Sequence, residues 1–274
     1  TGGMNMSGHG SFIWYELMTT DPLAAKHFYG AVVGWQIAAQ ADPAAGDIDY
    51  RMITRGDGGH AGGVLVLTKA MCDSGARPCW LGYLCVDDVD AITAAITTDG
   101  GSVMMPPMDL PVGRIAMLCD PQGAPFYVMK PMPPAGQQNA TNDVFSHMSP
   151  QHVRWNELST SDPQAAIAFY TQHFGWTQEG DLDMGEMGKY RFLQHQAAPI
   201  GAVMPRMPDM PVSAWQYYIG VDDIDRAVAA IASHGGRLFH DPMEIPGGEF
   251  AVSAMDPQGA AFGLVGPRAT GTAP

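Results

Sequence analysis

Residues 14–22 read Trp14-Tyr-Glu-Leu-Met-Thr-Thr-Asp-Pro22, and this block returns as Trp155-Asn-Glu-Leu-Ser-Thr-Ser-Asp-Pro163. Four further blocks recur in the same order: Phe28-Tyr29 to Gly34-Trp35 with Phe169-Tyr170 to Gly175-Trp176, Tyr50-Arg51 with Tyr190-Arg191, Val86-Asp-Asp-Val-Asp90 with Val221-Asp-Asp-Ile-Asp225, and Asp120-Pro-Gln-Gly-Ala124 with Asp256-Pro-Gln-Gly-Ala260. The offset stays at roughly 140 residues, and chance does not produce five matched blocks in order. The chain is therefore an internal duplication.

The duplication predicts two modules, residues 9–132 and 150–267. Residues 133–149 have no counterpart in either repeat and are rich in Pro, Gln, Asn and Ala, which indicates a linker. Residues 268–274 form a short C-terminal tail.

The local pattern predicts the same element order in each half of a module. A strand-like run over residues 12–18 precedes Asp21-Pro22, which supplies an N-cap and a first-turn proline for a helix. Short strand-like runs follow, and Asp120-Pro-Gln-Gly123 predicts a hairpin turn. The fold class is α+β, with tandem βαβββ repeats whose mixed, curved sheets each bury one face under helices and leave the other concave.

Methionines and prolines gather in two stretches, around Met104–Met108 and Met204–Met210. Because proline interrupts regular structure, we expect both stretches to be loops at the rim of a cavity. His195 lies in a Gln-His-Gln turn, where we expect a solvated side chain.

The ordered set of motifs, found twice, resembles the vicinal oxygen chelate superfamily of glyoxalases, bleomycin-resistance proteins and extradiol dioxygenases. The Trp-Tyr-Glu-Leu-x-Thr-x-Asp variant is most similar to two-module actinobacterial proteins labelled glyoxalase-like or "hydroxylase". Metal-dependent members hold Fe, Mn, Ni or Zn through His and Glu side chains. The resemblance places those ligands at Trp14, Leu81 and Tyr127 in module one and at Trp155, Gln216 and Gly263 in module two. None of the six suits a divalent metal, so we predict no cofactor, with a divalent metal as the alternative.

Composition restricts the partners. The formal net charge is −14, which argues against nucleic acid and anionic membrane surfaces. All four cysteines lie in the first half, so a disulfide framework shared by both modules is not indicated, and a reducing cytoplasm is expected. The predicted partner is a small molecule, bound by a monomer with intramolecular module pairing or by a homodimer.

Candidate site residues follow from strand alternation, which puts Glu16 on the face of Trp14 and Glu157 on the face of Trp155. A carboxylate on a partly apolar surface has a raised pKa and can act as a general base. The alternative is that each Glu forms a structural pair with Arg51 or Arg191. His60 is a third catalytic candidate, in a glycine-rich stretch with no histidine in the second repeat. The predicted ligand-binding residues are Trp14, Arg51, Tyr83, Tyr127, Trp155, Arg191, Gln216 and Tyr218; the tyrosines among them equally suit a packed interior.

Three function classes remain open at this point. One is a metal-free protein that binds a small organic molecule in a concave apolar cavity. Another is a metal-independent lyase, isomerase or hydrolase with a cavity Glu as base. The last is a divalent-metal glyoxalase or dioxygenase with displaced ligands such as His60 and Glu16.

Overall fold

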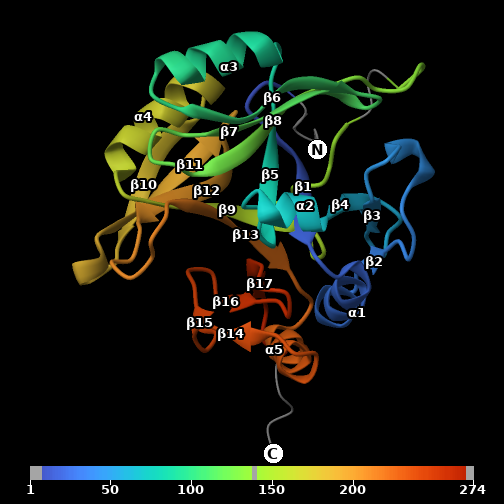
Figure 1. The fold of residues 1–274 in the computed structure, drawn as a ribbon. Coiled ribbons are helices and arrows are strands. Elements are labelled where there is room, and N and C mark those ends of the chain that lie inside the picture. Colours follow the sequence, from blue (N-terminus) through green and yellow to red (C-terminus); the bar gives the residue numbers. More distant parts are fainter. Residues whose placement is uncertain (1–7, 138–140, 270–274) are drawn as a thin grey trace, which may run out of the picture. The chain divides into compact units, whose positions relative to one another are not determined.

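The structure is a computed structural model that describes residues 8–137 and 141–269. Two compact units emerge from the contacts within the chain, and each combines half of one repeat with half of the other (Figure 1). Among the described residues, the first unit comprises residues 8–14, 81–137, 141–143 and 155–215. The second unit comprises residues 15–80, 144–154 and 216–269. The repeats are thus not the compact bodies of the fold, and the module boundaries 9–132 and 150–267 stay a prediction.

In the first unit, the half from repeat one has the elements β5 (Cys79–Cys85), α3 (Val89–Thr98), β6 (Ser102–Leu110), β7 (Gly113–Cys119) and β8 (Pro125–Pro131). The half from repeat two has β9 (Val153–Thr160), α4 (Pro163–Phe174), β10 (Thr177–Asp183), the 3-10 turn η2 (Gly185–Met187), β11 (Lys189–His195) and β12 (Ala198–Pro205). The strand orders are β5-β8-β7-β6 and β10-β11-β12-β9.

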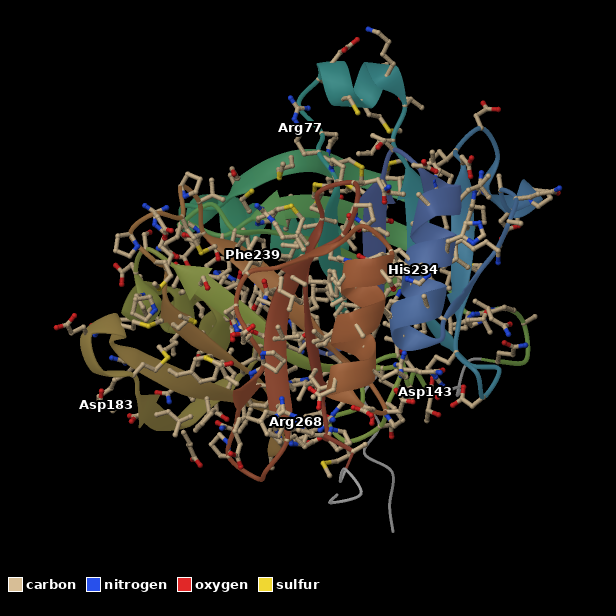
Figure 2. The ribbon with its side chains drawn as sticks, turned by 90° about the horizontal axis from the view of Figure 1, so that it is seen from below. Arg77, Asp143, Asp183, His234, Phe239 and Arg268 are labelled. Atoms are coloured by element: carbon tan, nitrogen blue, oxygen red, sulfur yellow. The ribbon has the colours of Figure 1, made fainter. Side chains whose placement is uncertain are left out.

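In the second unit, the half from repeat one has β1 (Phe12–Thr19), α1 (Pro22–Val33), β2 (Gln36–Ile37), η1 (Pro43–Ala45), β3 (Tyr50–Thr54), β4 (His60–Val66) and α2 (Lys69–Asp73). The half from repeat two has β13 (Ala214–Gly220), α5 (Ile224–Ser233), β14 (Arg237–Leu238), β15 (Met243–Glu244), β16 (Phe250–Met255) and β17 (Ala261–Gly266). Strands β1, β5, β9 and β13 each begin in one unit and continue into the other. Helices α1 and α5 lie side by side, with His234 at the end of α5 (Figures 1 and 2).

The predicted α+β fold of βαβββ repeats is confirmed. Each half contains one parallel pair, β1 with β4, β5 with β8, β9 with β12 and β13 with β17, and its other ladders are antiparallel. The N-caps are also where the sequence predicts them: Asp21 accepts from the Ala24 N–H, and Asp162 accepts from the Ala165 N–H.

A buried tyrosine–aspartate pair joins the two halves of each unit. Tyr170 of α4 donates a hydrogen bond of 2.8 Å to Asp120 in the turn of the other repeat, and Tyr29 of α1 donates one of 2.7 Å to Asp256. Desolvation raises the pKa of both aspartates, although the tyrosine hydrogen bonds act in the opposite direction. The recurring Phe-Tyr and Asp-Pro-Gln-Gly blocks therefore supply the donor and the acceptor of one buried hydrogen bond, which forms once in each unit.

Two expectations from the sequence were wrong. The stretch around Met104–Met108 is not a loop but lies within β6, at the end of its strand order, where Pro106 and Pro107 accompany shifts in register. Proline is tolerated there because an edge strand needs fewer ladder hydrogen bonds. His195 is only 4% exposed, because alternation along β11 puts it on the same side as buried Leu193.

Candidate functional site

The half-buried side of β9 carries two of the predicted site residues. Trp155 and Glu157 are partly exposed, whereas Arg154, Asn156 and Leu158 between and beside them are buried. Side chains that alternate in this way belong to opposite faces of a strand. Trp155 and Glu157 thus share the face that is turned away from the core.

Tyr190 of β11 joins these two side chains into a relay of hydrogen bonds. The Trp155 indole N–H donates to the Tyr190 hydroxyl at 2.7 Å, and that hydroxyl donates to Glu157 Oε2 at 2.8 Å. The Phe192 ring stands edge-on to both Trp155 and Tyr190. We call Trp155, Glu157, Tyr190 and Phe192 the relay cluster. It holds a carboxylate at a fixed place among aromatic rings, where it can accept a hydrogen bond or a proton from a ligand.

Sequence reasoning missed Tyr190. The repeated pair Tyr190-Arg191 is visible in the sequence, but the predicted binding residue of the pair is Arg191. Arg191 alternates with Tyr190 along β11 and therefore points to the other face. Strand alternation could have identified Tyr190, because Glu157 and Tyr190 can meet only if both side chains lie on the same face of the sheet.

A second group in the first unit is formed by Tyr83 of β5 and Tyr127 of β8. They are direct partners in the parallel ladder, and their rings stack with centroids 4.2 Å apart. The row continues through Met117 of β7 to Met105 of β6. Both tyrosines are buried, with exposed fractions of 6% and 4%, so these two predicted ligand-binding residues lie in the interior of the unit. Thioethers adapt their shape to such apolar surroundings. We call Tyr83 and Tyr127 the tyrosine stack.

The remaining repeat-one candidates do not gather in the same way. Trp14 lies half-buried on β1, and Glu16, two residues along, is 2% exposed and opposite Gly63 of β4. Burial and then the charge of Glu16 raise the pKa of the nearby Cys79 thiol to about 12, so this thiol stays protonated at neutral pH. Arg51 does not pair with Glu16 but donates to Asp49 and to the Ala39 carbonyl.

His60 is exposed and begins β4 instead of lying in a flexible loop. His60 lies three positions before Gly63, the partner of Glu16, which corresponds to about 10 Å along a strand, and the register of β3 and β4 shifts between Ile53 and Thr54 in this stretch. His60 is exposed whereas Glu16 is 2% exposed, so the two side chains lie in different surroundings.

In the second unit, Gln216 and Tyr218 of β13 meet at one hydroxyl. Gln216 Nε2 donates to Ser253 Oγ at 2.7 Å, and the Tyr218 and Ser253 hydroxyls lie 3.3 Å apart. Two open grooves, of about 480 and 360 Å³, lie beside Lys26 and Met52 and beside His9 and Asp88. Neither is lined by the relay cluster, the tyrosine stack or the residues around Ser253.

The residues at the expected metal positions do not fit a divalent metal. Tyr127 is covered by the stacked Tyr83 ring, and a Cβ at Gly263 would lie 2.4 Å from the Tyr218 ring. The other four positions hold Trp14, Leu81, Trp155 and Gln216, which offer no imidazole or carboxylate. Over residues 8–137 and 141–269, no three His, Cys, Asp or Glu side chains are grouped so that they could hold a metal. Within the same ranges, no helix has the length and apolar character needed to cross a membrane.

Comparison with known proteins gives two kinds of finding. A candidate glyoxylase of Mycobacterium tuberculosis, CFP32, is 35% identical over 259 residues, which cover 93% of this chain and 94% of that protein. The anthracycline biosynthesis protein DnrV of Streptomyces peucetius is 29% identical over 280 residues and covers 93% of both. The Mn(II)-bound glyoxalase of Novosphingobium aromaticivorans has a similar fold, with a TM-score of 0.60, 17% identity, and coverage of 94% of this chain and 82% of its own.

The family model of the Glyoxalase/Bleomycin resistance protein/Dioxygenase superfamily matches the chain twice, at residues 11–127 and 149–264. Both matches extend over the repeated blocks, from before the first strand of each repeat into its last strand. This chain belongs to the Glyoxalase/Bleomycin resistance protein/Dioxygenase superfamily.

Proposed function

We propose that the first unit binds a small, flat, hydroxylated aromatic molecule without a metal. The observation that carries this proposal is the relay from Trp155 through Tyr190 to Glu157. The relay fixes a carboxylate among aromatic side chains, which matches the few well-placed polar groups and apolar walls of a small-molecule site.

The geometry supports a planar ligand with a hydroxyl group. The two oxygens of a carboxylate offer about four acceptor positions, so the Glu157 carboxylate can accept from a phenolic hydroxyl whose ring lies against Trp155 or Phe192. The tyrosine stack is buried, and half-buried Met117 extends its row, so these residues form a second apolar wall within the same unit. The name of the Streptomyces relative, an anthracycline biosynthesis protein, agrees with a flat aromatic ligand.

Titration with 1,8-dihydroxyanthraquinone tests the proposal. We expect saturable binding at one site per chain, measured by isothermal titration calorimetry. Glu157→Gln should weaken it by about tenfold, because a hydrogen bond to a charged group contributes about 1.5 to 3 kcal/mol. Glu186→Gln, an exposed glutamate in the same unit, is the matched control and should bind like the parent.

Two outcomes contradict the proposal: no saturable binding, or the same affinity in Glu157→Gln and Glu186→Gln. A Tyr83→Leu, Tyr127→Leu double variant examines the second wall separately. Loss of ligand affinity in Glu157→Gln only would restrict the site to the relay cluster.

A metal-independent enzyme with Glu157 as general base is the second candidate. The fixed position of this half-buried carboxylate favours it. Turnover of a bound aromatic probe, lost in Glu157→Gln and indifferent to chelator, would identify the enzyme. Loss of turnover with chelator, restored by Fe, Mn, Ni or Zn, would instead identify a metal enzyme with ligands in unexpected places.

A further inference from the structure

One row of side chains in the second unit has a chemistry different from that of the first unit. Tyr218 of β13 is paired with Gly263 of β17, and Gly263 is paired with Ser253 of β16. A Cβ at Gly263 would lie 2.4 Å from Tyr218 Cδ1, so only glycine lets the tyrosine ring lie across the strand at this point. Lying there, the ring brings its hydroxyl to 3.3 Å from Ser253 Oγ.

Gln216 completes the group from the same side of β13. Its Nε2 donates to Ser253 Oγ at 2.7 Å, and the side chains of Gln216, Tyr218 and Ser253 are all half-buried. Each of the three residues therefore keeps some exposure to solvent. We call Gln216, Tyr218 and Ser253 the amide-reading group.

His240 holds the main chain of Ser253. Its Nδ1 lies 2.7 Å from the Asp241 carbonyl, which can only accept, so Nδ1 carries the proton. Its Nε2 is therefore the unprotonated nitrogen, and it accepts the Ser253 N–H at 3.2 Å. His240 is a positioning residue, since it acts on the backbone of Ser253 and not on the hydroxyl.

The corresponding row of the first unit is apolar. Tyr83 is paired with Tyr127 and Tyr127 with Met117, which stand where Tyr218, Gly263 and Ser253 stand in the second unit. Leu81 occupies the place of Gln216. Three differences, Leu to Gln, Tyr to Gly and Met to Ser, thus turn an apolar row into a polar one on the same backbone.

We propose that the second unit holds a separate binding site, which takes a neutral ligand with adjacent N–H and C=O groups, such as a lactam or an amide. The three side chains of the amide-reading group carry no charge, so an ionic ligand would lose hydration without gaining a counter-charge from them. A carboxamide like that of Gln216 offers a donor and an acceptor, the complement of a lactam edge. The site is distinct from the relay cluster and does not depend on the function proposed for the first unit.

Two probes that differ by one methyl group test this site. 2-Quinolone presents a lactam N–H and C=O, and N-methyl-2-quinolone lacks the donor. With the full chain, we expect saturable binding of 2-quinolone by isothermal titration calorimetry and a Kd at least about tenfold weaker for the methylated probe. This comparison uses the unaltered protein, so it does not depend on whether a variant folds.

Variants then locate the site. Gln216→Leu, which introduces the residue that stands at position 81, should weaken 2-quinolone binding about tenfold, and Ser253→Ala should weaken it severalfold. Ser233→Ala, which removes an exposed hydroxyl on α5, is the control and should leave 2-quinolone binding unchanged.

The proposal is overturned by any of three results. These are no saturable binding of 2-quinolone, equal affinity for both probes, or an unchanged Kd in folded Gln216→Leu. An effect of Glu157→Gln on 2-quinolone would place this ligand in the first unit and would also overturn it.

Discussion

Tyr170→Phe removes a single hydroxyl from the core of the first unit and keeps the ring, which stacks on Trp176 with centroids 5.1 Å apart. Two hydrogen bonds disappear: the bond from Tyr170 to Asp120 and the bond of 3.1 Å from the Trp215 indole N–H to Tyr170. A hydrogen bond to a charged group contributes about 1.5 to 3 kcal/mol, and a buried donor left without an acceptor costs about 1 to 3 kcal/mol. We therefore expect a loss of about 3 to 5 kcal/mol in the free energy of unfolding, a large share of the stability of a domain.

Equilibrium urea unfolding, followed by tryptophan fluorescence and far-UV circular dichroism, measures this loss. Tyr29→Phe is the matched variant in the second unit, because Tyr29 donates to Asp256 and accepts from Trp80 in the same way. In a double-mutant cycle with Asp120→Asn, the two losses should fall short of additivity by more than 1 kcal/mol. A loss below about 1 kcal/mol in both tyrosine variants would refute the idea that these pairs fasten the halves of each unit.

The pH dependence of the same variant has a definite sign. Burial raises the folded pKa of Asp120 above its unfolded value, so the folded chain binds the proton more readily. Below the raised pKa the carboxyl is neutral and needs the tyrosine donor less. The deficit of Tyr170→Phe should thus be largest near pH 7 and shrink as the pH falls through the folded pKa of Asp120; a deficit that grows on acidification contradicts this account.

Three other substitutions have expected outcomes in urea unfolding. Burial lowers the folded pKa of His195, so the stability that neutral His195 gives is lost as the pH falls below its unfolded pKa of about 6.5. In His195→Leu the free energy of unfolding should therefore decline less steeply between pH 7.5 and 5.5. An identical slope in the parent and the variant would contradict this expectation. Gly263→Ala should cost about 1 to 3 kcal/mol by overpacking against Tyr218, whereas a neutral result would show that the ring moves freely. Hydrogen bonds from Arg154 hold the pKa of Glu249 below its usual value. Glu249→Gln should therefore lower the free energy of unfolding by about 1 to 2 kcal/mol at pH 7, and by nothing once the pH has fallen through that lowered pKa. A loss that does not change with pH would exclude the charged pair as its origin.

The sequence predicts the fold well because the evidence for it is local and is present twice. Strand parity places Trp155 with Glu157, and the caps at Asp21 and Asp162 mark the helix starts. These features depend on the two-residue alternation of a strand and on residues close together in the chain, and both can be read from a single sequence.

What the sequence does not reveal depends on contacts between distant residues. The exchange of halves between the repeats rests on pairs such as Tyr170 with Asp120, whose members lie 50 residues apart, and no local pattern tells which repeat supplies the partner. The burial of His195 likewise depends on what covers the end of β11. Proline predicts a loop where the structure has β6, because sequence alone does not distinguish an edge strand from a loop.

The duplication explains how one chain can present two different sites. The tyrosine–aspartate pairs and the capping aspartates are kept in both repeats because they hold the halves together, and a change at any of them would cost stability. The half-buried row across β13, β17 and β16 lies within one half and does not join the two halves of the unit. Its residues Gln216, Gly263 and Ser253 can therefore differ from their counterparts in the first unit, which are Leu81, Tyr127 and Met117. If stability rather than ligand chemistry determined this row, Gln216→Leu with Ser253→Met would be neutral for 2-quinolone binding and would raise the free energy of unfolding. If the row reads a ligand, the same exchange should abolish 2-quinolone binding while the fold persists.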